Sequence, residues 1–531
     1  MMQNRAKLHG NKKNKLLSFL IITLIVSSTI FYNLLYFKYI RIDPDEGLII
    51  ADAEKILDQP FPYLKFNIHM PGKYYLLALF YLLFGRSIAV ARIMFIFIHC
   101  LNNVLAFLLA RKILPYPFSL LPSLLLLLVP GYWHKSFVAM LLLLNLYSIF
   151  NLQKSFSKKA IILSSLVIGV SFYFRVDMAG YGMIATGTVI LISSYLRRIV
   201  FSKVIANLLI FSLSIILFIS PLFILHGIKN EIDFPIERII KDIKNSNRQS
   251  FPFPNPKILI DKPTKILSKD KAVFFIYSTI LALFLTTFFL LVRIKNHKFL
   301  LNIKNEYIFS TLILALLSFN HIWPFSTYIF RISQSGILIH LLWAFLLYQS
   351  YKLLFSKQSL FLSFLILLFF VFSLLVQIYF VYFSFCGPSR IVQDASTITQ
   401  RAGSHQELIS PKAGISPPLA QAKAFNHLFN FIIKNTKPND KIFCFGDSVL
   451  YFLSDRKNAT DFTNMMDVTI DSKSRKILKS QLFNQNPKIV ICKNSQYRYF
   501  KPFIPEIFEE ITKRYNRYRI TSGYRAYMLK K

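Results

Sequence analysis

Apolar runs long enough to cross a bilayer, or nearly so, recur from about residue 16 to about residue 385 and alternate with short polar segments. A transmembrane helix needs roughly 20 apolar residues. The pattern therefore predicts eleven spans, near residues 16–38, 88–110, 117–131, 137–152, 160–174, 180–196, 204–226, 272–292, 306–320, 336–351 and 359–385. The first run is longer than a signal-peptide core and has no small-residue cleavage pattern after it, so we expect it to be retained.

One apolar run, residues 74–85, is only about twelve residues long, which is typical of an interfacial or re-entrant helix. Counting it as a span would reverse the orientation of every later loop. We therefore expect it to lie on the outer face, within a first outer loop of residues 39–87.

The composition excludes an ordinary soluble protein, because 54% of the 531 residues are hydrophobic and 54 Phe stand against 25 acidic residues. A net charge of +38 would suggest nucleic acid in a soluble chain, but here the basic residues lie mainly in the tails and in short loops. If the tail of residues 1–15 is cytoplasmic, every short loop on its side is basic. We expect no nucleic-acid partner, and a multi-pass protein of the cytoplasmic (inner) membrane whose C-terminus is outside.

After the transmembrane domain of residues 16–385, alternating helix and strand patterns predict a small extracytoplasmic α/β domain over residues 386–531. "AFNHLFNFIIKN" and "PEIFEEITKRY" predict helices, whereas "DKIFCFG" and "PKIVICKN" predict buried strands. This domain is basic, which would suit anionic lipid headgroups, and a solvated basic surface fits equally well. The long outer loop of residues 227–271 fits a lid over a cavity or a structureless connector.

The cysteines show no metal or redox spacing. Cys444 and Cys492 both fall in predicted strands of the outer domain. The sequence leaves open whether they form a disulfide or stay as buried thiols.

Six of the seven acidic residues among the first 230 positions lie between Asp43 and Asp58. Asp43 as N-cap, Pro44 at the first helical position and Glu46 three residues after the cap predict a helix start. The residues that follow predict an amphipathic interfacial helix. This predicted helix start assigns no structural role to Asp45.

Further polar residues are expected on the outer face, near the ends of spans. They are His69, Lys73, His134, Lys135, Arg175, Asp177, Tyr328 and Arg331. Basic side chains here suit a phosphate ligand, but aromatic and basic residues also anchor helix ends at the interface. The sequence leaves both interpretations open.

The order of basic tail, span, D-P-D-E-G, amphipathic helix, P-G-x-Y-Y, short apolar run, F-G-R-S and A-R resembles the N-terminal signature of the GT-C superfamily. Within it, the resemblance is to the ArnT, protein-mannosyltransferase and RgtA/B/C/D-like group. These are multi-span glycosyltransferases that use polyprenyl-phosphate-linked sugars. The resemblance covers residues 16 to about 200, and the rest of the chain resembles the group more loosely.

The resemblance implies that Asp45 is the catalytic base of an inverting glycosyl transfer, with Glu46 orienting the acceptor or a metal. The implied partners are a polyprenyl-phosphate sugar donor, an acceptor that is a lipid, glycan or protein, and membrane lipids. The basic and polar residues of the outer face would bind the donor phosphate and substrate. The cofactor is left open: Asp45, Glu46 and Asp177 could share a divalent metal ion.

Two other functions compete with this one. An O-antigen ligase or polymerase also uses lipid-linked glycans, but such enzymes usually centre on a large outer loop with Arg and His. A transporter of lipid-linked sugars would place ionisable groups at mid-membrane, whereas the acids of the first half of this chain lie near the surface.

The one-sided basic loops make the topology testable. Reporter fusions after residues 155, 200 and 296 should all report the cytoplasm. A reporter found outside at any of these positions would mean that residues 74–85 cross the membrane.

Overall fold

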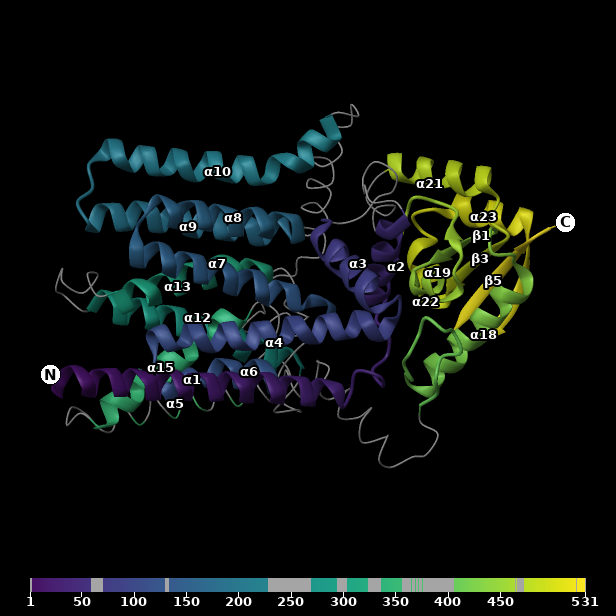
Figure 1. Ribbon diagram of the computed structural model, residues 1–531. Coiled ribbons are helices and arrows are strands. Elements are labelled where there is room, and N and C mark those ends of the chain that lie inside the picture. The colour runs from purple at the N-terminus through teal and green to yellow at the C-terminus, as the bar shows by residue number, and fades with distance from the viewer. Residues whose placement is uncertain are drawn as a thin grey trace. The chain divides into compact units, whose positions relative to one another are not determined.

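The structure is a computed structural model (Figure 1), and it describes residues 2–58, 70–128, 133–227, 269–293, 303–322, 336–355, 405–463, 465, 472–521 and 523–530, with single helical positions at 364, 368, 371 and 375. The contacts of the chain divide it into two compact units. We call residues 1–35, 95–218 and 250–389 the helical unit, and residues 36–94, 219–249 and 390–531 the mixed unit.

Helices that run side by side make up the helical unit (Figure 1). They are α1 (Met2–Leu34), most of α4 (Ile88–Ile113), α5 (Tyr116–Ser119), α6 (Leu121–Leu128), the 3-10 turn η1 (Trp133–Lys135), α7 (Ser136–Ser155), α8 (Lys158–Phe174), α9 (Val176–Leu196), α10 (Phe201–Gly227), α12 (Lys269–Arg293), α13 (Ile303–Ile322) and α15 (Ile337–Phe355). The described parts of the predicted spans are mainly helical, but the first span ends at Leu34 and not at residue 38, and the run 117–131 is divided between α5 and α6.

Five helices of the described residues are long and apolar enough to cross a membrane: α1 over Leu16–Leu34, α4, α7, α9 and α10 over Phe201–Ile224. The predicted multi-span helical architecture agrees with this. The predicted count of eleven spans stays a prediction, and most of the last one, 359–385, lies outside the described residues.

Small and polar residues join the helices of the helical unit. The Asn145 side chain donates to Ser171 Oγ at 3.0 Å, and Gly182 makes room for it, since a Cβ at Gly182 would lie 2.1 Å from Asn145 Oδ1. Gln153 donates to Ser310 Oγ at 2.6 Å. Close backbone approach at a small residue and hydrogen bonds between helices are the usual ways in which membrane helices associate.

The mixed unit contains a five-stranded sheet of order β2-β1-β3-β5-β4. Its elements are α2 (Pro44–Asp58), α3 (Gly72–Phe84), α18 (Leu419–Asn435), β1 (Lys441–Phe445), α19 (Val449–Ser454), β2 (Lys457–Asn458), α21 (Ser472–Gln485), β3 (Ile489–Lys493), α22 (Asn494–Phe500), α23 (Pro505–Arg514), β4 (Tyr515–Thr521) and β5 (Tyr524–Leu529). β1 pairs in parallel with both β2 and β3, and β5 is antiparallel to β3 and β4. The predicted small α/β domain is therefore present.

From β1 the chain crosses through α19 to β2, and from β2 it crosses in the opposite direction through α21 to β3 on the other side of β1. Because such crossovers are right-handed, α19 and α21 cover opposite faces of the sheet. On the α21 side, Phe443, Phe445 and Val490 are buried against α21, α22 and α23.

Cys444 and Cys492 are both buried free thiols, so the disulfide alternative is wrong and the thiol alternative is confirmed. The register explains why: β1 places Phe445, not Cys444, opposite Cys492. Neighbouring residues of a strand point to opposite faces, so the two sulfurs lie on different sides of the sheet. Burial raises the pKa of both thiols.

Residues 39–87 pack with the C-terminal part of the chain inside the mixed unit. Gly47 of α2 lies against α19, where a Cβ would be 3.0 Å from Val449 Cβ. Tyr81 of α3 stacks on Phe452 of α19, with ring centroids 5.7 Å apart. The opposite side of α3 exposes leucines, with Leu82 71% and Leu83 65% accessible. Residues 39–87, which the sequence analysis grouped with the transmembrane domain, thus share a compact unit with residues 390–531.

Candidate active site at the start of α2

The acidic segment begins α2 as the sequence predicts. The Asp45 backbone N–H donates to Asp43 Oδ1 at 2.9 Å, and the Asp43 backbone N–H donates to Glu46 Oε2 at 3.4 Å. These reciprocal bonds satisfy donors at the helix start, and Pro44 occupies the first helical position. The capping interpretation of Asp43 and Glu46 is therefore confirmed.

Glu46 also makes a buried ion pair. Its Oε1 accepts from Arg92 Nε at 2.7 Å and its Oε2 accepts from Arg92 Nη2 at 3.1 Å, with the two side chains 7% and 1% exposed. Arg92 additionally donates to the carbonyl oxygens of Phe37 and Arg41. A bidentate Arg–carboxylate pair fixes geometry as well as charge, so Arg92 ties α4, α2 and the segment before α2 together.

Asp45 lies on a different face of α2 from Glu46. Successive helical residues are about 100° apart, and accordingly Glu46 is buried while Asp45 is exposed. One acid of the pair is therefore built into the protein interior and its neighbour is presented at the surface. With both Glu46 oxygens bonded to Arg92, the role of Glu46 toward an acceptor or a metal stays a prediction.

The polar face of α2 differs from the expected interfacial helix, because other parts of the mixed unit cover it. Glu54 accepts from Lys412 at 2.7 Å, and Lys412 also reaches Asp455 at 2.5 Å. Arg86 lies 3.7 Å from Glu54. Burial raises the pKa of Glu54, an effect that Lys412 opposes. The helix period cannot reveal this covering, since Lys412 is 358 positions from Glu54 in the chain.

Lys55 of α2 is also covered. Its ammonium bonds to Thr463 Oγ1 and lies 3.9 Å from Asp52, which is only 1% exposed. Burial lowers the pKa of Lys55, and the Asp52 carboxylate opposes this effect.

In the helical unit, Arg175 and Asp177 form a bidentate pair at the junction of α8 and α9. Arg175 Nε and Nη2 lie 3.0 and 2.7 Å from the Asp177 oxygens, and each side chain is about a third exposed. Asp177 Oδ1 also accepts the Met178 backbone N–H at 3.0 Å. The pair fixes a helix start, as the structural alternative predicts, and its role toward a substrate stays a prediction.

His134 and Lys135 lie in η1, directly before α7. Asn102 of α4 donates to the Ser136 carbonyl oxygen at 2.9 Å and so holds this turn. Asn102 is 14 residues, or about 21 Å, along α4. The turn is thus held beside the middle of α4.

The remaining candidates divide between described and undescribed residues. Lys73 lies in the first turn of α3, with its ammonium 4.9 Å from the Tyr74 ring. His69, Tyr328 and Arg331 lie outside the described residues, as does most of the loop 227–271.

The carboxylates that could bind a divalent cation in the mixed unit differ from the predicted set of Asp45, Glu46 and Asp177. Carboxylate oxygens of Asp43 and Asp45 lie within 4.8 Å of each other, whereas both Glu46 oxygens are bonded to Arg92. Asp177 belongs to the helical unit. Carboxylates are suitable ligands for hard cations, so Asp43 fits such an ion better than Glu46 does.

Comparison with solved structures identifies the fold. ArnT from Cupriavidus metallidurans in the apo state matches with a TM-score of 0.50 and 13% identity, over 97% of this chain and 98% of that one. The same protein bound to undecaprenyl phosphate matches with a TM-score of 0.50 and 12% identity, over 96% and 97%. The chain has the GT-C fold.

The GT-C fold extends over nearly the whole chain, including the C-terminal part where the sequence resemblance is loose. The archaeal oligosaccharyltransferase AglB from Archaeoglobus fulgidus, in complex with an inhibitory peptide and a dolichol-phosphate, matches over 98% of this chain and 75% of that one, with 12% identity and a TM-score of 0.48. No protein-family model and no curated protein sequence matches the chain. The resemblance predicted from the sequence is thus confirmed at the level of the fold.

Arg92 is the arginine of the A-R element, and no partner was predicted for it from the sequence. A signal for its importance was present, because an arginine inside the apolar run "IAVARIMFIF" needs a buried partner. The nearest acidic residues before it in the chain are those of the cluster between Asp43 and Asp58, which includes Glu46.

The buried Glu46–Arg92 pair leads to a prediction about the stability of the mixed unit. Arg92→Met should destabilise the mixed unit by about 3–5 kcal/mol, because it leaves the Glu46 charge buried without a partner. Adding Glu46→Gln should recover part of this loss. Thermal unfolding of the purified proteins in detergent measures both effects.

A matched control is available on the surface of the same unit, where Arg514 lies 2.5 Å from Glu510 with both side chains exposed to solvent. Arg514→Met should change stability by less than about 1 kcal/mol. If Arg92→Met unfolds at the same temperature as Arg514→Met, the buried pair does not have the stabilising role described above.

Proposed function

We propose that this chain is a membrane glycosyltransferase that moves a sugar from a polyprenyl-phosphate donor to a lipid, glycan or protein acceptor on the outer face of the cytoplasmic membrane. The proposal depends on one observation: of the two adjacent acids Asp45 and Glu46, Glu46 is buried in an ion pair with Arg92, whereas Asp45 is exposed at the surface. The GT-C fold and the ArnT structure bound to undecaprenyl phosphate support a lipid-linked donor.

In the proposed reaction, an acceptor hydroxyl attacks the anomeric carbon of the donor sugar. The bond from that carbon to the phosphate oxygen breaks as the new glycosidic bond forms on the opposite side, so the configuration inverts. The acceptor oxygen must lose its proton during the attack. Asp45, an exposed carboxylate at the positive end of a helix, takes this proton as the general base.

The anchor explains why Asp45 suits this task better than its neighbours. Asp43 is engaged in capping, since its Oδ1 accepts the Asp45 backbone N–H. Glu46 is held by Arg92. A base must be positioned within hydrogen-bond reach of the proton it removes. Because α2 is anchored by Arg92, the backbone position from which the Asp45 side chain extends is fixed.

The leaving phosphate requires positive charge, and we propose that Lys135 and Arg175 supply it. Both lie at turns between helices of the helical unit, in η1 and between α8 and α9. A guanidinium can bind a phosphate by two parallel hydrogen bonds, and because Asp177 occupies Nε and Nη2 of Arg175, the phosphate would share or displace that carboxylate. Cationic donors that meet charge developing on a leaving group typically stabilise a transition state by about 2–4 kcal/mol each.

The broad experiment is a comparison of envelope glycans and lipid-linked sugars between a deletion strain and its parent by mass spectrometry. The deletion strain should lack one sugar on one acceptor and should accumulate the polyprenyl-phosphate form of that sugar. This result would name the donor and the acceptor together. Identical glycan and lipid-linked profiles would contradict the proposed function.

The residue-level prediction is that Asp45→Asn lowers turnover in membranes by roughly 10²–10⁴-fold, because it keeps the shape of the side chain and removes the base. The matched control is Asp43→Asn, which replaces one good N-cap residue by another and should change turnover little. Turnover is followed with the donor and acceptor named by the glycan comparison, at equal amounts of folded protein. An active Asp45→Asn variant beside an inert Asp43→Asn variant would mean that the segment is only a helix cap.

A further inference from the structure

Residues 408–421, which end in the first turn of α18, hold other parts of the mixed unit by hydrogen bonds, and we call them the connecting segment. The Lys412 carbonyl oxygen accepts the Ile88 N–H at 2.9 Å, and the Ala413 carbonyl oxygen accepts the Ala89 N–H at 3.3 Å. Ile88 and Ala89 begin α4. The two carbonyl groups therefore satisfy donors that a helix start leaves without an intrahelical partner.

The connecting segment also holds the chain just before α2. Ser416 donates its backbone N–H to the Lys38 carbonyl oxygen at 2.8 Å. The Gln421 side chain makes two hydrogen bonds to one residue: its Oε1 accepts the Ile42 N–H and its Nε2 donates to the Ile42 carbonyl oxygen, each at 2.9 Å. The side-chain amide thus pairs with Ile42 as a residue of a neighbouring β-strand would, although the two residues are 379 positions apart.

A glutamine is well suited to this contact. Ile42 is only 4% exposed, and buried backbone N–H and carbonyl groups need partners. A neutral side-chain amide offers a donor and an acceptor side by side, whereas a carboxylate only accepts and an ammonium only donates. Replacing Gln421 by a residue without an amide therefore leaves at least one buried backbone group of Ile42 without its partner.

Ile42 precedes Asp45 by three residues, and the hydrogen bonds between them are local. The Asp43 N–H donates to Glu46 Oε2, Pro44 has no N–H, and the Asp45 N–H donates to Asp43 Oδ1. The partner of the Ile42 N–H, in contrast, comes from α18. The local bonds give the turn its shape, and the contact from α18 fixes where that turn begins.

Two side chains from outside α2 thus hold the two ends of the acidic turn. Arg92 of α4 binds Glu46 and sets the rotation of the helix. Gln421 of α18 binds Ile42 and sets where the chain enters the helix. A displacement of about 1 Å in a catalytic group can lower a rate by roughly 10²-fold. Both contacts therefore bear on a base that must meet a proton at hydrogen-bond distance.

We propose that Gln421 is a positioning residue for Asp45, and that the C-terminal part of the chain thereby completes the active site. This assignment rests on the proposed function, because it takes Asp45 as the base. Gln421 acts by holding the backbone of Ile42 and not by touching the substrates. Its loss should therefore impair catalysis only while Asp45 is present to take the proton.

The test is a double-mutant cycle between Asp45→Asn and Gln421→Met, which keeps the length of the side chain and removes both hydrogen bonds. The glycan that the deletion strain lacks is followed by mass spectrometry, as its rate of formation in membranes of that strain per amount of folded variant. Gln421→Met alone should lower this rate by roughly 10–10²-fold. In the Asp45→Asn background it should lower the residual rate by less than about threefold, because a residue that acts through Asp45 then has no base to position.

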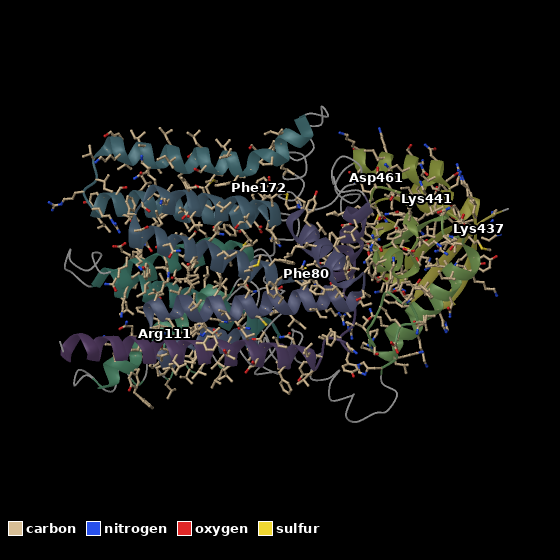
Figure 2. The ribbon with its side chains drawn as sticks, in the orientation of Figure 1. Phe80, Arg111, Phe172, Lys437, Lys441 and Asp461 are labelled. Carbon is tan, nitrogen blue, oxygen red and sulfur yellow. The ribbon has the colours of Figure 1, made fainter. Side chains whose placement is uncertain are left out.

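Gln481 provides a matched control in the same unit. Its Oε1 accepts the Asp461 N–H at 3.0 Å and its Nε2 donates to the Asp461 carboxylate, so its amide also makes two hydrogen bonds to one residue. Asp461 is exposed, and it is labelled in Figure 2. Gln481→Met should leave the rate unchanged, because its bonds hold no part of the acidic turn.

A second measurement needs no turnover. Hydrogen exchange of the purified full-length chain in detergent, followed by mass spectrometry, should be roughly tenfold or more faster at residues 43–47 in Gln421→Met. Exchange at these residues should be unchanged in Gln481→Met. If Gln421→Met does not fold, Gln421→Glu, which keeps the acceptor and loses the donor, carries both measurements.

The outcomes separate this proposal from the proposed function. Equal losses of rate from Gln421→Met in both backgrounds, beside an impaired Asp45→Asn variant, would overturn the positioning role alone, as would unchanged exchange at residues 43–47. A fully active Asp45→Asn variant would overturn the base assignment and the positioning role together.

Discussion

The buried ion pair between Glu46 and Arg92 is the constraint on which the proposed active site depends. An arginine that is 1% exposed can be kept in an apolar helix only if its charge is met, and here a carboxylate and two carbonyl oxygens meet it. The pair fixes the rotation of α2 about its own axis. Once Glu46 must point inward, the helix period decides that Asp45 points outward.

The same constraint gives neighbouring acids different chemistry. Glu46 is neutralised by an adjacent guanidinium and serves the structure, while Asp45 keeps its carboxylate at the surface. The rest of the mixed unit reinforces this arrangement, since Lys412 and Arg86 engage Glu54 further along α2. The helix is thus held at its first turn and again along its length, which positions a base better than a mobile loop would.

Local patterns predicted what local physics determines. Capping and hydrophobic periodicity depend on residues that are close together in the chain. The sequence therefore predicted the start of α2, the helices of the transmembrane part, and the elements α18, β1, β3 and α23. The partners of Arg92, Glu54 and Lys412 were missed, because these contacts join residues far apart in the chain. The β4–β5 hairpin was also missed: its alternation of Tyr with Arg resembles a basic surface segment more than a strand.

The central claim is that Asp45 acts as the base of a direct displacement at the anomeric carbon. The most direct measurement is the anomeric configuration of the transferred sugar, determined by NMR and compared with that of the donor. A direct displacement inverts the configuration, because the acceptor oxygen attacks from the side opposite the leaving phosphate, so we expect inversion. Retention of configuration would contradict it, since it would require a covalent or front-face mechanism in which Asp45 is not simply a base.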